Sequence, residues 1–344
     1  MHDPLTATQA VTVIIPHLKN RSLLESCLES LRMTTYPDFT ILIVDNGGDF
    51  SDTAGIETIY PEITLLRLPS NAGYAGGCNE GLKRAVSEYV VFLNDDTVVE
   101  PQWLDHLLRE AGRHERIGAL QPKILSLPEG REGRRIFDYA GAAGGLLDRL
   151  GYPFCLGRSF SGREEDRGQY DEAQEIFWAS GVALFAPRQV LEEMGGFEAG
   201  FFMHMEEIDL CWRMRIAGYS IRSVPQSVVW HVGGASLQEG SPMKVYLNHR
   251  NGMAMLIRNR RAVSLSFVLP VRLFLEAAAA VYYITGGSDG LAKARQVLRA
   301  ALDNLRGLGE TLRKRGEIQR TRRKSERELF HGAPLTMFLM RRMP

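Results

Sequence analysis

Apolar runs alternate with stretches of helical spacing along the first 231 residues. Residues 11–15, 39–44, 65–68 and 89–93 are predicted strands, because each is a short, mainly apolar run next to turn-forming residues. Apolar side chains recur every three or four positions from 23 to 31, and a second helical stretch runs to about residue 87. This alternation predicts a largely parallel sheet covered on both faces.

The pattern is less regular after residue 126. Residues 126–175 are rich in Gly, Arg and Glu and are expected to form loops and short strands over the sheet edge. Residues 176–185 resemble a strand interrupted at Ala179-Ser180-Gly181. Further elements are expected in this order: a helix over 188–194, a helix from Glu206 that Gly218 ends, and strands over 220–224 and 228–231.

The character of the chain changes beyond residue 241. Residues 262–285 are mostly apolar, but Arg272 and Glu276 interrupt them and Pro270 should kink a helix, so a full bilayer span is not expected. The basic stretch from Arg313 to Arg327 beside this apolar segment favours attachment to a membrane surface. A solvated charged tail or an oligomer contact would give the same pattern. We therefore expect a catalytic domain at 11–240 and a membrane-associating or oligomerising helical region at 241–344.

Composition narrows the class of protein. The 344 residues are 44% hydrophobic and 24% charged, which is ordinary for a chain with a real core. The balance of 41 basic and 41 acidic residues argues against a nucleic-acid partner. The 4 cysteines lie far apart without a CxxC pair, which predicts buried thiols in a reducing cytosol. Residues 1–10 lack a basic start and an apolar run, so no signal peptide is expected and the cytoplasmic side is favoured.

Candidate chemistry gathers where predicted strands end. Asp95 and Asp96 follow the strand at 89–93, and His231 follows the apolar run at 228–230. The carboxyl edge of such a sheet is where ligands bind, and Asp oxygen with His nitrogen suits Mg²⁺ or Mn²⁺. Taken singly, the two aspartates are compatible with a simple turn and the histidine with a structural role.

Three other features have functional and ordinary interpretations. Asp45 ends the strand at 39–44 and could accept hydrogen bonds from a base or ribose, or form an Asx turn. The glycine-rich residues 71–79 could bring backbone N–H groups close to a phosphate, although no dinucleotide or Walker pattern is present. Glu206 and Glu207 begin a predicted helix, whose N-terminal partial charge favours ionised carboxylates; ordinary capping explains them equally well.

Together these motifs resemble one family. In order, the segments are Val13-Ile14-Ile15-Pro16, Val44-Asp45-Asn46, Asn71-x-Gly73-x-x-Gly76-Gly77-x-Asn79, Leu93-Asn94-Asp95-Asp96, Phe201 to Arg213, and Trp230-His231-Val232-Gly233-Gly234. The pattern resembles the family 2 inverting glycosyltransferases of the GT-A fold, nearest to the rhamnosyltransferase-like branch, over residues 11–240. The resemblance implies an α/β GT-A domain, Rossmann-like, with a C-terminal helical extension.

The resemblance also implies roles. It makes Glu207 the catalytic base, although the family commonly has Asp there, and it makes Asp96 and His231 ligands of a divalent metal, Mg or Mn. Asn94 replaces the first carboxylate of the family's Asp-x-Asp motif. The implied donor-binding residues are Pro16, Asp45, Asn71, Gly73, Gly76, Asn79, Asp95, Trp178, Ser180 and Gly181.

The implied reaction moves a sugar from a nucleotide-diphosphate donor to a glycan or polyprenyl-linked acceptor at the inner face of the cell membrane, and a homo-oligomer is possible. Two alternatives stay open. A nucleotidyltransferase also uses an acidic metal site, but the chain lacks a Gly-rich basic loop after its first strand. An inactive sugar-nucleotide-binding scaffold is favoured slightly by Asn94 and Glu207.

Overall fold

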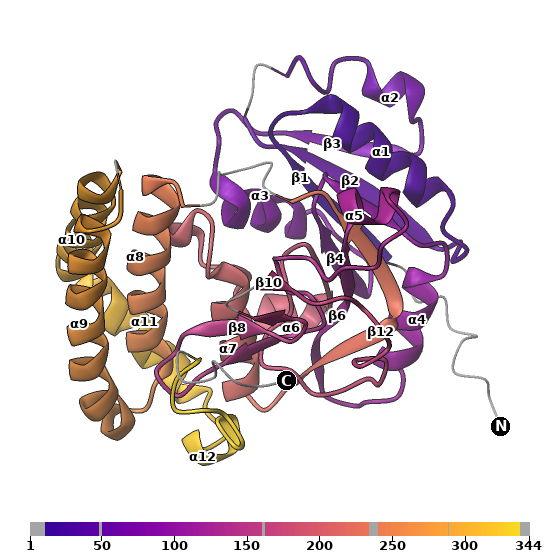
Figure 1. Ribbon diagram of the computed structural model, residues 1–344. Coiled ribbons are helices and arrows are strands. Elements are labelled where there is room, and N and C mark those ends of the chain that lie inside the picture. Colours follow the sequence, from indigo (N-terminus) through magenta and orange to yellow (C-terminus); the bar gives the residue numbers. More distant parts are fainter. Residues whose placement is uncertain (1–10, 48–49, 160–161, 234–239, 288, 338–344) are drawn as a thin grey trace.

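The computed structural model describes residues 11–47, 50–159, 162–233, 240–287 and 289–337. One large sheet has helices on both faces, and a bundle of helices from the end of the chain stands beside it (Figure 1). Residues 1–10, where no signal peptide is expected, and Gly234 of the last quoted motif lie outside the described residues.

The elements follow the expected order, with more short strands than the sequence predicted. The strands are β1 (Val11–His17), β2 (Phe39–Asp45), β3 (Ile63–Arg67), β4 (Tyr89–Leu93), β5 (Thr97–Val99), β6 (Ile117–Ser126), β7 (Gly145–Leu147), β8 (Pro153–Cys155), β9 (Arg158–Ser159), β10 (Gly162–Arg163), β11 (Ala183–Pro187) and β12 (Ser220–His231). The helices are α1 (Arg21–Arg32), α2 (Ile56–Ile59), α3 (Gly73–Leu82), α4 (Trp103–Ala111), α5 (Leu127–Arg131), α6 (Arg188–Glu193), the 3₁₀ turn η1 (Ala199–Phe201), α7 (Glu206–Ile216), α8 (Pro242–Asn259), α9 (Ala262–Ile284), α10 (Gly290–Arg306), α11 (Leu308–Arg320) and α12 (Glu326–Leu329).

The large sheet has the strand order β3-β2-β1-β4-β11-β6-β12-β5. The first four strands are parallel, as predicted. The sheet as a whole is mixed, because β11 runs antiparallel to β4 and β6, and β5 runs antiparallel to β12. Since β12 is parallel to β6, its direction matches that of β4, and the carboxyl ends of β1, β2, β4 and β12 share one edge.

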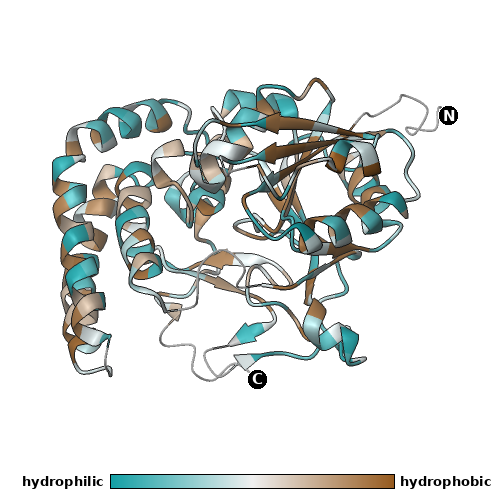
Figure 2. Ribbon diagram, turned by 90° about the horizontal axis from the view of Figure 1, so that it is seen from above, coloured by the Kyte–Doolittle hydropathy of each residue, from teal (hydrophilic) through white to brown (hydrophobic). Residues whose placement is uncertain are grey.

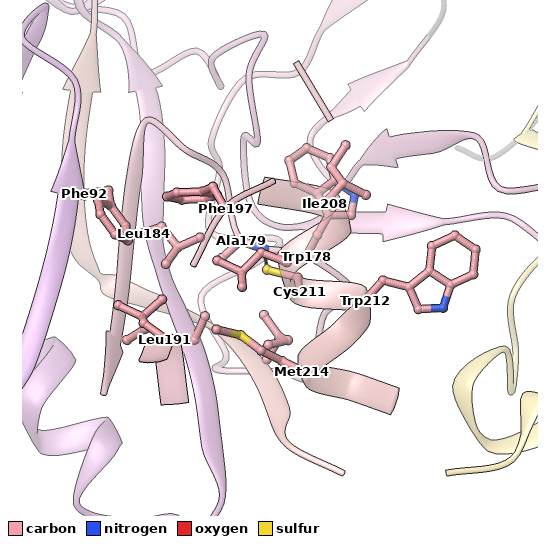
Figure 3. Packing of buried hydrophobic residues seen from close by; sticks show 14 of the residues in the cluster. Phe92, Trp178, Ala179, Leu184, Leu191, Phe197, Ile208, Cys211, Trp212 and Met214 are labelled. Carbon is pink, nitrogen blue, oxygen red and sulfur yellow. Dashed lines mark hydrogen bonds between the residues drawn. The ribbon is translucent and has the colours of Figure 1, made fainter. Parts of the chain in front are cut away.

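Each face of the sheet has its own core. Along β1 the side chains alternate: Val13 and Ile15 pack toward α1 and α4, whereas Ile14 packs toward α3. Figure 3 shows the second core, where Phe92 and Leu184 of the sheet meet apolar side chains of α7. Brown, hydrophobic colour predominates along the central strands in Figure 2, as expected for strands buried on both faces.

Two strand predictions are wrong in detail. β11 starts only at Ala183, because the chain is irregular before it: the Ile176 N–H bonds to the Ile221 carbonyl of β12, but the Ser180 N–H bonds to the side chain of Gln121. The strands predicted over 220–224 and 228–231 form the single strand β12. Its register shifts between Val224 and Val228, where Pro225 offers no N–H to the ladder.

Residues 262–285 are the apolar segment that was not expected to span a bilayer, and this expectation stays a prediction. They form one helix, α9, with Pro270 inside it, and Pro270 is exposed so that the carbonyl it leaves unpaired can meet solvent. By length and composition α9 is apolar enough to cross a membrane, with a hydropathy of 1.6 over its most apolar window. Only 6% of that window is buried inside the protein. Arg272 and Glu276 are buried on the inner side and pair with each other at 3.1 Å.

Helix α8 joins the C-terminal bundle to the sheet domain. It contacts α10 and α11 on one side and α7 on the other (Figure 1). Much of the basic stretch that follows is engaged in this packing: Lys314 pairs with Glu198, and Arg322 donates to the Asn259 carbonyl at 2.5 Å. These cations hold the protein together, so they contribute less to a membrane-facing charge than the sequence suggested.

All four cysteines, Cys27, Cys78, Cys155 and Cys211, are free and buried, as predicted. Burial raises the pKa of Cys27, Cys155 and Cys211 to about 12 and that of Cys78 well above its ordinary value. These thiols therefore act as small apolar core groups.

Candidate active site

Residues 94–96, here called the acidic loop, follow β4 near the middle of the sheet. The Asn94 N–H donates to the Val182 carbonyl at 2.9 Å, which extends the pairing with β11 and fixes where the loop begins. Asp95 turns toward β1, and Asp96 turns toward β12. The adjacent carboxylates therefore have different partners, which relieves their mutual repulsion.

Asp96 and Asp138 enclose His231. His231 Nε2 lies 3.1 Å from Asp96 Oδ1, and its Nδ1 lies 3.0 Å from Asp138 Oδ2. Burial by itself would lower the pKa of His231, but the two carboxylates raise it to about 10. Burial opposes ionisation of Asp96, yet His231 holds the Asp96 pKa below its ordinary value. Asp138 fixes the ring so that Nε2 faces Asp96.

His17 occupies the other end of the acidic loop. Its Nδ1 lies 2.6 Å from Asp95 Oδ2, and its Nε2 lies 3.7 Å from Asp52 Oδ2. Burial raises the pKa of Asp95, although His17 opposes that shift. Asp45 pairs in register with His17, is buried, and accepts a hydrogen bond from Thr53 Oγ1 at 2.5 Å. Pro16 precedes His17 at the same edge of the sheet.

The glycine-rich segment packs against the loop before α7. Gly73 starts α3 with a φ of +72°, and a Cβ there would lie 2.4 Å from the Phe202 carbonyl oxygen. The N–H groups of residues 72, 73 and 75 already bond to Asn46 Oδ1, Asn71 Oδ1 and the Phe202 carbonyl. The glycine is thus required for close packing. The expected approach of a phosphate to backbone N–H groups is not available at these three positions.

The remaining donor-site candidates on α3 are also in contact with protein. A Cβ atom added to Gly76 would lie 2.7 Å from the Ala72 methyl group, so Gly76 packs closely against Ala72. Asn79 uses both ends of its amide on Phe197, donating to its carbonyl at 2.8 Å and accepting from its N–H at 2.9 Å. Asn79 therefore holds the segment that leads to α7. Direct contact of either residue with a donor stays a prediction.

Residues 178–181 form a buried loop beside the acidic edge. Trp178 Nε1 donates to the Leu146 carbonyl at 2.8 Å, and Ser180 Oγ donates to the Ala140 carbonyl at 3.0 Å. Tyr74 Oη donates to the Gly181 carbonyl at 2.5 Å and so ties this loop to α3. The loop lies against residues 138–142, which also supply the carboxylate that orients His231.

Glu206 and Glu207 begin α7, as predicted. In each carboxylate the Oε2 atom is buried and has no hydrogen-bond partner. Burial raises the pKa of Glu207 to about 7, and burial together with Glu207 raises that of Glu206 well above its ordinary value. The expectation that the helix N-terminus would favour the ionised form is therefore wrong in its net effect, because desolvation outweighs the helix dipole. A carboxylate with a pKa near 7 suits general-base chemistry.

The loop of residues 178–181 joins α7 to the histidine site. The Ala179 N–H donates to Cys211 Sγ of α7 at 3.4 Å, and Ser180 Oγ donates to the carbonyl of Ala140, two residues after Asp138. The same loop therefore contacts the helix that Glu206 and Glu207 begin and the segment whose carboxylate orients His231.

The residues at this edge fit a divalent cation only in part. Asp96 Oδ1 is buried without a hydrogen-bond partner, and His231 Nε2 faces it. Within the described residues no group of three or more His, Cys, Asp or Glu side chains is placed to hold a metal ion by itself. One aspartate and one histidine can hold Mg²⁺ or Mn²⁺ when diphosphate oxygens and water complete the shell. The Asn94 amide lies 3.5 Å from His231 Nε2. It occupies the position where the family's Asp-x-Asp motif has its first carboxylate.

Comparison with known proteins supports the family expected from the sequence. The model of glycosyl transferase family 2 matches residues 12–168, which contain β1 to β10 and the acidic loop. This part of the chain is similar to that family, in agreement with the resemblance found in the sequence. The GT-A fold expected from the sequence is confirmed.

Two curated relatives have names that refer to O-antigen biosynthesis and to rhamnosyl transfer. The chain is 29% identical to the O-antigen biosynthesis protein RfbC of Myxococcus xanthus over 68% of its own length, but it spans only 18% of that protein. It is also 29% identical to the N-acetylglucosaminyl-diphospho-decaprenol L-rhamnosyltransferase of Mycobacterium tuberculosis, over 60% of this chain and 71% of that one.

Solved structures share the fold at low sequence identity. GalNAc-T7 with UDP, GalNAc and Mn²⁺ has a TM-score of 0.54 at 13% identity, covering 77% of this chain and 55% of that one. The TarS fragment 1–349 of S. aureus has a TM-score of 0.53 at 14% identity, covering 90% of this chain and 89% of that one. At such identities the likeness is one of fold alone.

Sequence reasoning missed several residues that shape the site. His17 directly follows a predicted strand, so its position was a usable signal. Tyr74 lies inside the glycine-rich residues 71–79, where only the glycines and asparagines were candidates. Asp138 lies in the irregular stretch, and Asn251, which bonds to the loop before α7, lies in the region expected to be an appendage. Nothing in the local sequence marks either of these last two.

Proposed function

We propose that this chain is an inverting glycosyltransferase that moves a hexosyl or deoxyhexosyl group from a nucleoside-diphosphate sugar to a hydroxyl of a glycan or polyprenyl-linked acceptor. Glu207 acts as the general base that takes the proton from the acceptor hydroxyl. Inversion requires a single displacement, so one base and one stabiliser of the leaving diphosphate are sufficient. Two features of Glu207 support this assignment. Burial raises its pKa to about 7, and its buried Oε2 atom has no hydrogen-bond partner.

In this proposal Asp96 and His231 hold a divalent cation, Mg²⁺ or Mn²⁺, against the donor diphosphate. The bound ion would neutralise the charge that develops on the diphosphate as the sugar leaves. Asp138 keeps His231 Nε2 pointed toward Asp96, and the solved structure of GalNAc-T7, which shares the fold, contains Mn²⁺. Asp45 and Asp95, with His17 between them, are placed to bind the nucleoside end.

The observation that carries the proposal is that the loop of residues 178–181 contacts both α7, which begins at the two glutamates, and residues 138–142, whose Asp138 orients His231 toward Asp96. A nucleotidyltransferase would use the metal site but has no need for a buried base at α7. An inactive scaffold would have no need to keep a carboxylate desolvated and unpaired. Both alternatives are therefore less well supported than glycosyl transfer.

The acceptor is expected to approach from the side of α8 and α9. A cavity of about 130 Å³ lies there, lined by Met205, which immediately precedes the glutamates, and by Tyr152, His249 and Arg272. The outer side of α9 is apolar: Phe267 is 74% and Phe274 71% exposed. We expect this face to rest peripherally on the inner surface of the cell membrane, which would bring a lipid-linked acceptor to the cavity.

Replacing Glu207 by Gln tests the proposal. The Gln side chain keeps the shape but cannot take a proton, so transfer should fall by about a hundredfold or more. Protection of the protein against thermal unfolding by the donor and Mn²⁺ should persist, because Glu207 is not proposed to bind either one. A panel of UDP-, dTDP- and GDP-sugars, with release of nucleoside diphosphate as the readout, identifies the donor.

Glu206→Gln is the matched control, since the two glutamates are adjacent and each has a buried Oε2 atom. A larger loss in Glu206→Gln than in Glu207→Gln would move the base assignment by one residue. Release of pyrophosphate instead of nucleoside diphosphate would replace the glycosyltransferase proposal by nucleotidyl transfer. Donor binding without turnover under any acceptor or metal would support the scaffold alternative.

A further inference from the structure

Asn251 of α8 bonds to three backbone carbonyls of the loop that precedes the proposed base. Its Nδ2 lies 3.0 Å from the Phe201 oxygen, 3.0 Å from the Met203 oxygen and 2.8 Å from the His204 oxygen. Its Oδ1 accepts from Arg250 Nε at 2.8 Å. Asn251 is fully buried, so the orientation of its amide is set by these partners: carbonyls on one side and a guanidinium on the other.

The loop that Asn251 holds has an unfavourable backbone. Phe202, His204 and Met205 all have positive φ angles, of 67°, 67° and 72°, and none of them is glycine. A positive φ is unfavourable for a residue that carries a Cβ, and it persists only where the surroundings impose it. α7 begins at the next residue, and Met205, its N-cap, makes no side-chain capping bond.

The same loop is held from the opposite side by α3. The Ala75 N–H donates to the Phe202 carbonyl at 3.1 Å, and the ring of Phe202 covers Gly73. With the three bonds from Asn251, each carbonyl from 201 to 204 has a partner outside the loop. The loop is therefore clamped between the glycine-rich helix and a helix of the C-terminal region.

We propose that Asn251 is a positioning residue for Glu207: by holding the carbonyls of residues 201, 203 and 204, it fixes the strained loop that determines where α7 starts and where the base points. This inference rests on the proposed function. It assigns a role in the reaction to α8, which lies outside the part of the chain that matches the family model. Without the amide, three converging carbonyls would lose a donor inside the protein, and the loop would relax toward ordinary φ angles.

The test compares Asn251→Ala and Asn251→Asp with wild type in the full-length protein. Asp has the size of Asn and can still accept from Arg250, but it offers no N–H to the carbonyls. Both variants should lose about a hundredfold in kcat, the effect of misplacing a catalytic group by about 1 Å, with the donor KM changed less than about threefold. Asn251→Gln, which retains the donor, should recover part of the lost kcat.

Asn304→Ala is the control. Asn304 Nδ2 donates to the Arg250 carbonyl at 3.1 Å, so this variant also removes an amide bond to α8, but none to the loop. Its kcat should stay within about twofold of wild type. Thermal unfolding of every variant, with UDP, dTDP and GDP plus Mn²⁺ as binding probes, separates loss of fold from loss of turnover.

Wild-type kcat in Asn251→Asp would overturn the inference, as would a loss that Asn304→Ala shares. If Asn251→Ala does not fold, the contrast between Asp and Gln decides, because they differ in the donor that the inference requires; equal kcat in those two variants refutes it. A fully active Glu207→Gln would instead refute the proposed base. The two failures are thus distinguishable.

Discussion

Arg258 should be the most sensitive ion-pairing residue at the junction between α7 and α8. Its guanidinium lies 2.7 Å from Asp209 Oδ1 and also pairs with Glu198. Asp209 is fully buried, and Arg258 is the strongest of the charges that hold the Asp209 pKa low against burial. Removing one partner of a buried ion pair costs about 3–5 kcal/mol, because the other charge stays desolvated. Arg213 and Asn259 still contact Asp209, so Arg258→Ala should fall near the lower end, about 3 kcal/mol.

Urea unfolding followed by circular dichroism measures this loss, and a thermal scan should show a fall of very roughly 6–12 °C for a domain of this size. Arg313→Ala is the control, because Arg313 lies in the same C-terminal region but pairs with exposed Glu310 and Glu317. It should leave the midpoint unchanged. If the two variants lose the same stability, or if Arg258→Ala loses less than about 1 kcal/mol, Asp209 does not depend on α8.

Three further predictions follow from the site and the surface. Transfer should rise with pH through about 7, since the burial-raised pKa of Glu207 leaves the carboxylate protonated below that value; a flat profile from pH 5.5 to 8.5 would exclude it as the base. Asp96→Ala and His231→Ala should weaken donor binding with Mn²⁺ far more than with EDTA, and equal losses would assign them direct or structural roles. Phe267→Ser with Phe274→Ser should reduce cosedimentation with anionic liposomes without changing turnover on a soluble acceptor; unchanged sedimentation would exclude the α9 face.

The sequence predicted those features whose signals lie within a few residues of one another. Strands of the first half and the start of α7 were predicted because apolar runs and capping patterns lie within a few residues of each other. Asp95, Asp96 and Glu207 were found because they end or begin such elements. The placement of the two aspartates at the sheet edge follows from parallel strands alone, whereas that of Glu207 depends on the loop held by α3 and α8.

What the sequence did not reveal depends on contacts between distant segments. Asp138 and His231 are 93 residues apart, and no periodicity links them. Asn79 and Gly73 were interpreted as donor contacts, whereas the structure uses Asn79 to hold the Phe197 backbone and Gly73 to admit Phe202. A truncation after residue 240, the domain boundary expected from the sequence, would remove Asn251 and Arg258, whose bonds reach back to α7 and the loop before it.

The burial of the cysteines has a practical consequence for labelling the protein with a dye at a single site. The chain has 4 cysteines, all of them desolvated and with raised pKa values, so the folded protein should react slowly with maleimides. A cysteine introduced at Tyr282, on the exposed side of α9, would then be the one readily labelled site. A solvatochromic dye attached there would report the polarity that α9 meets at a vesicle surface in the otherwise native enzyme.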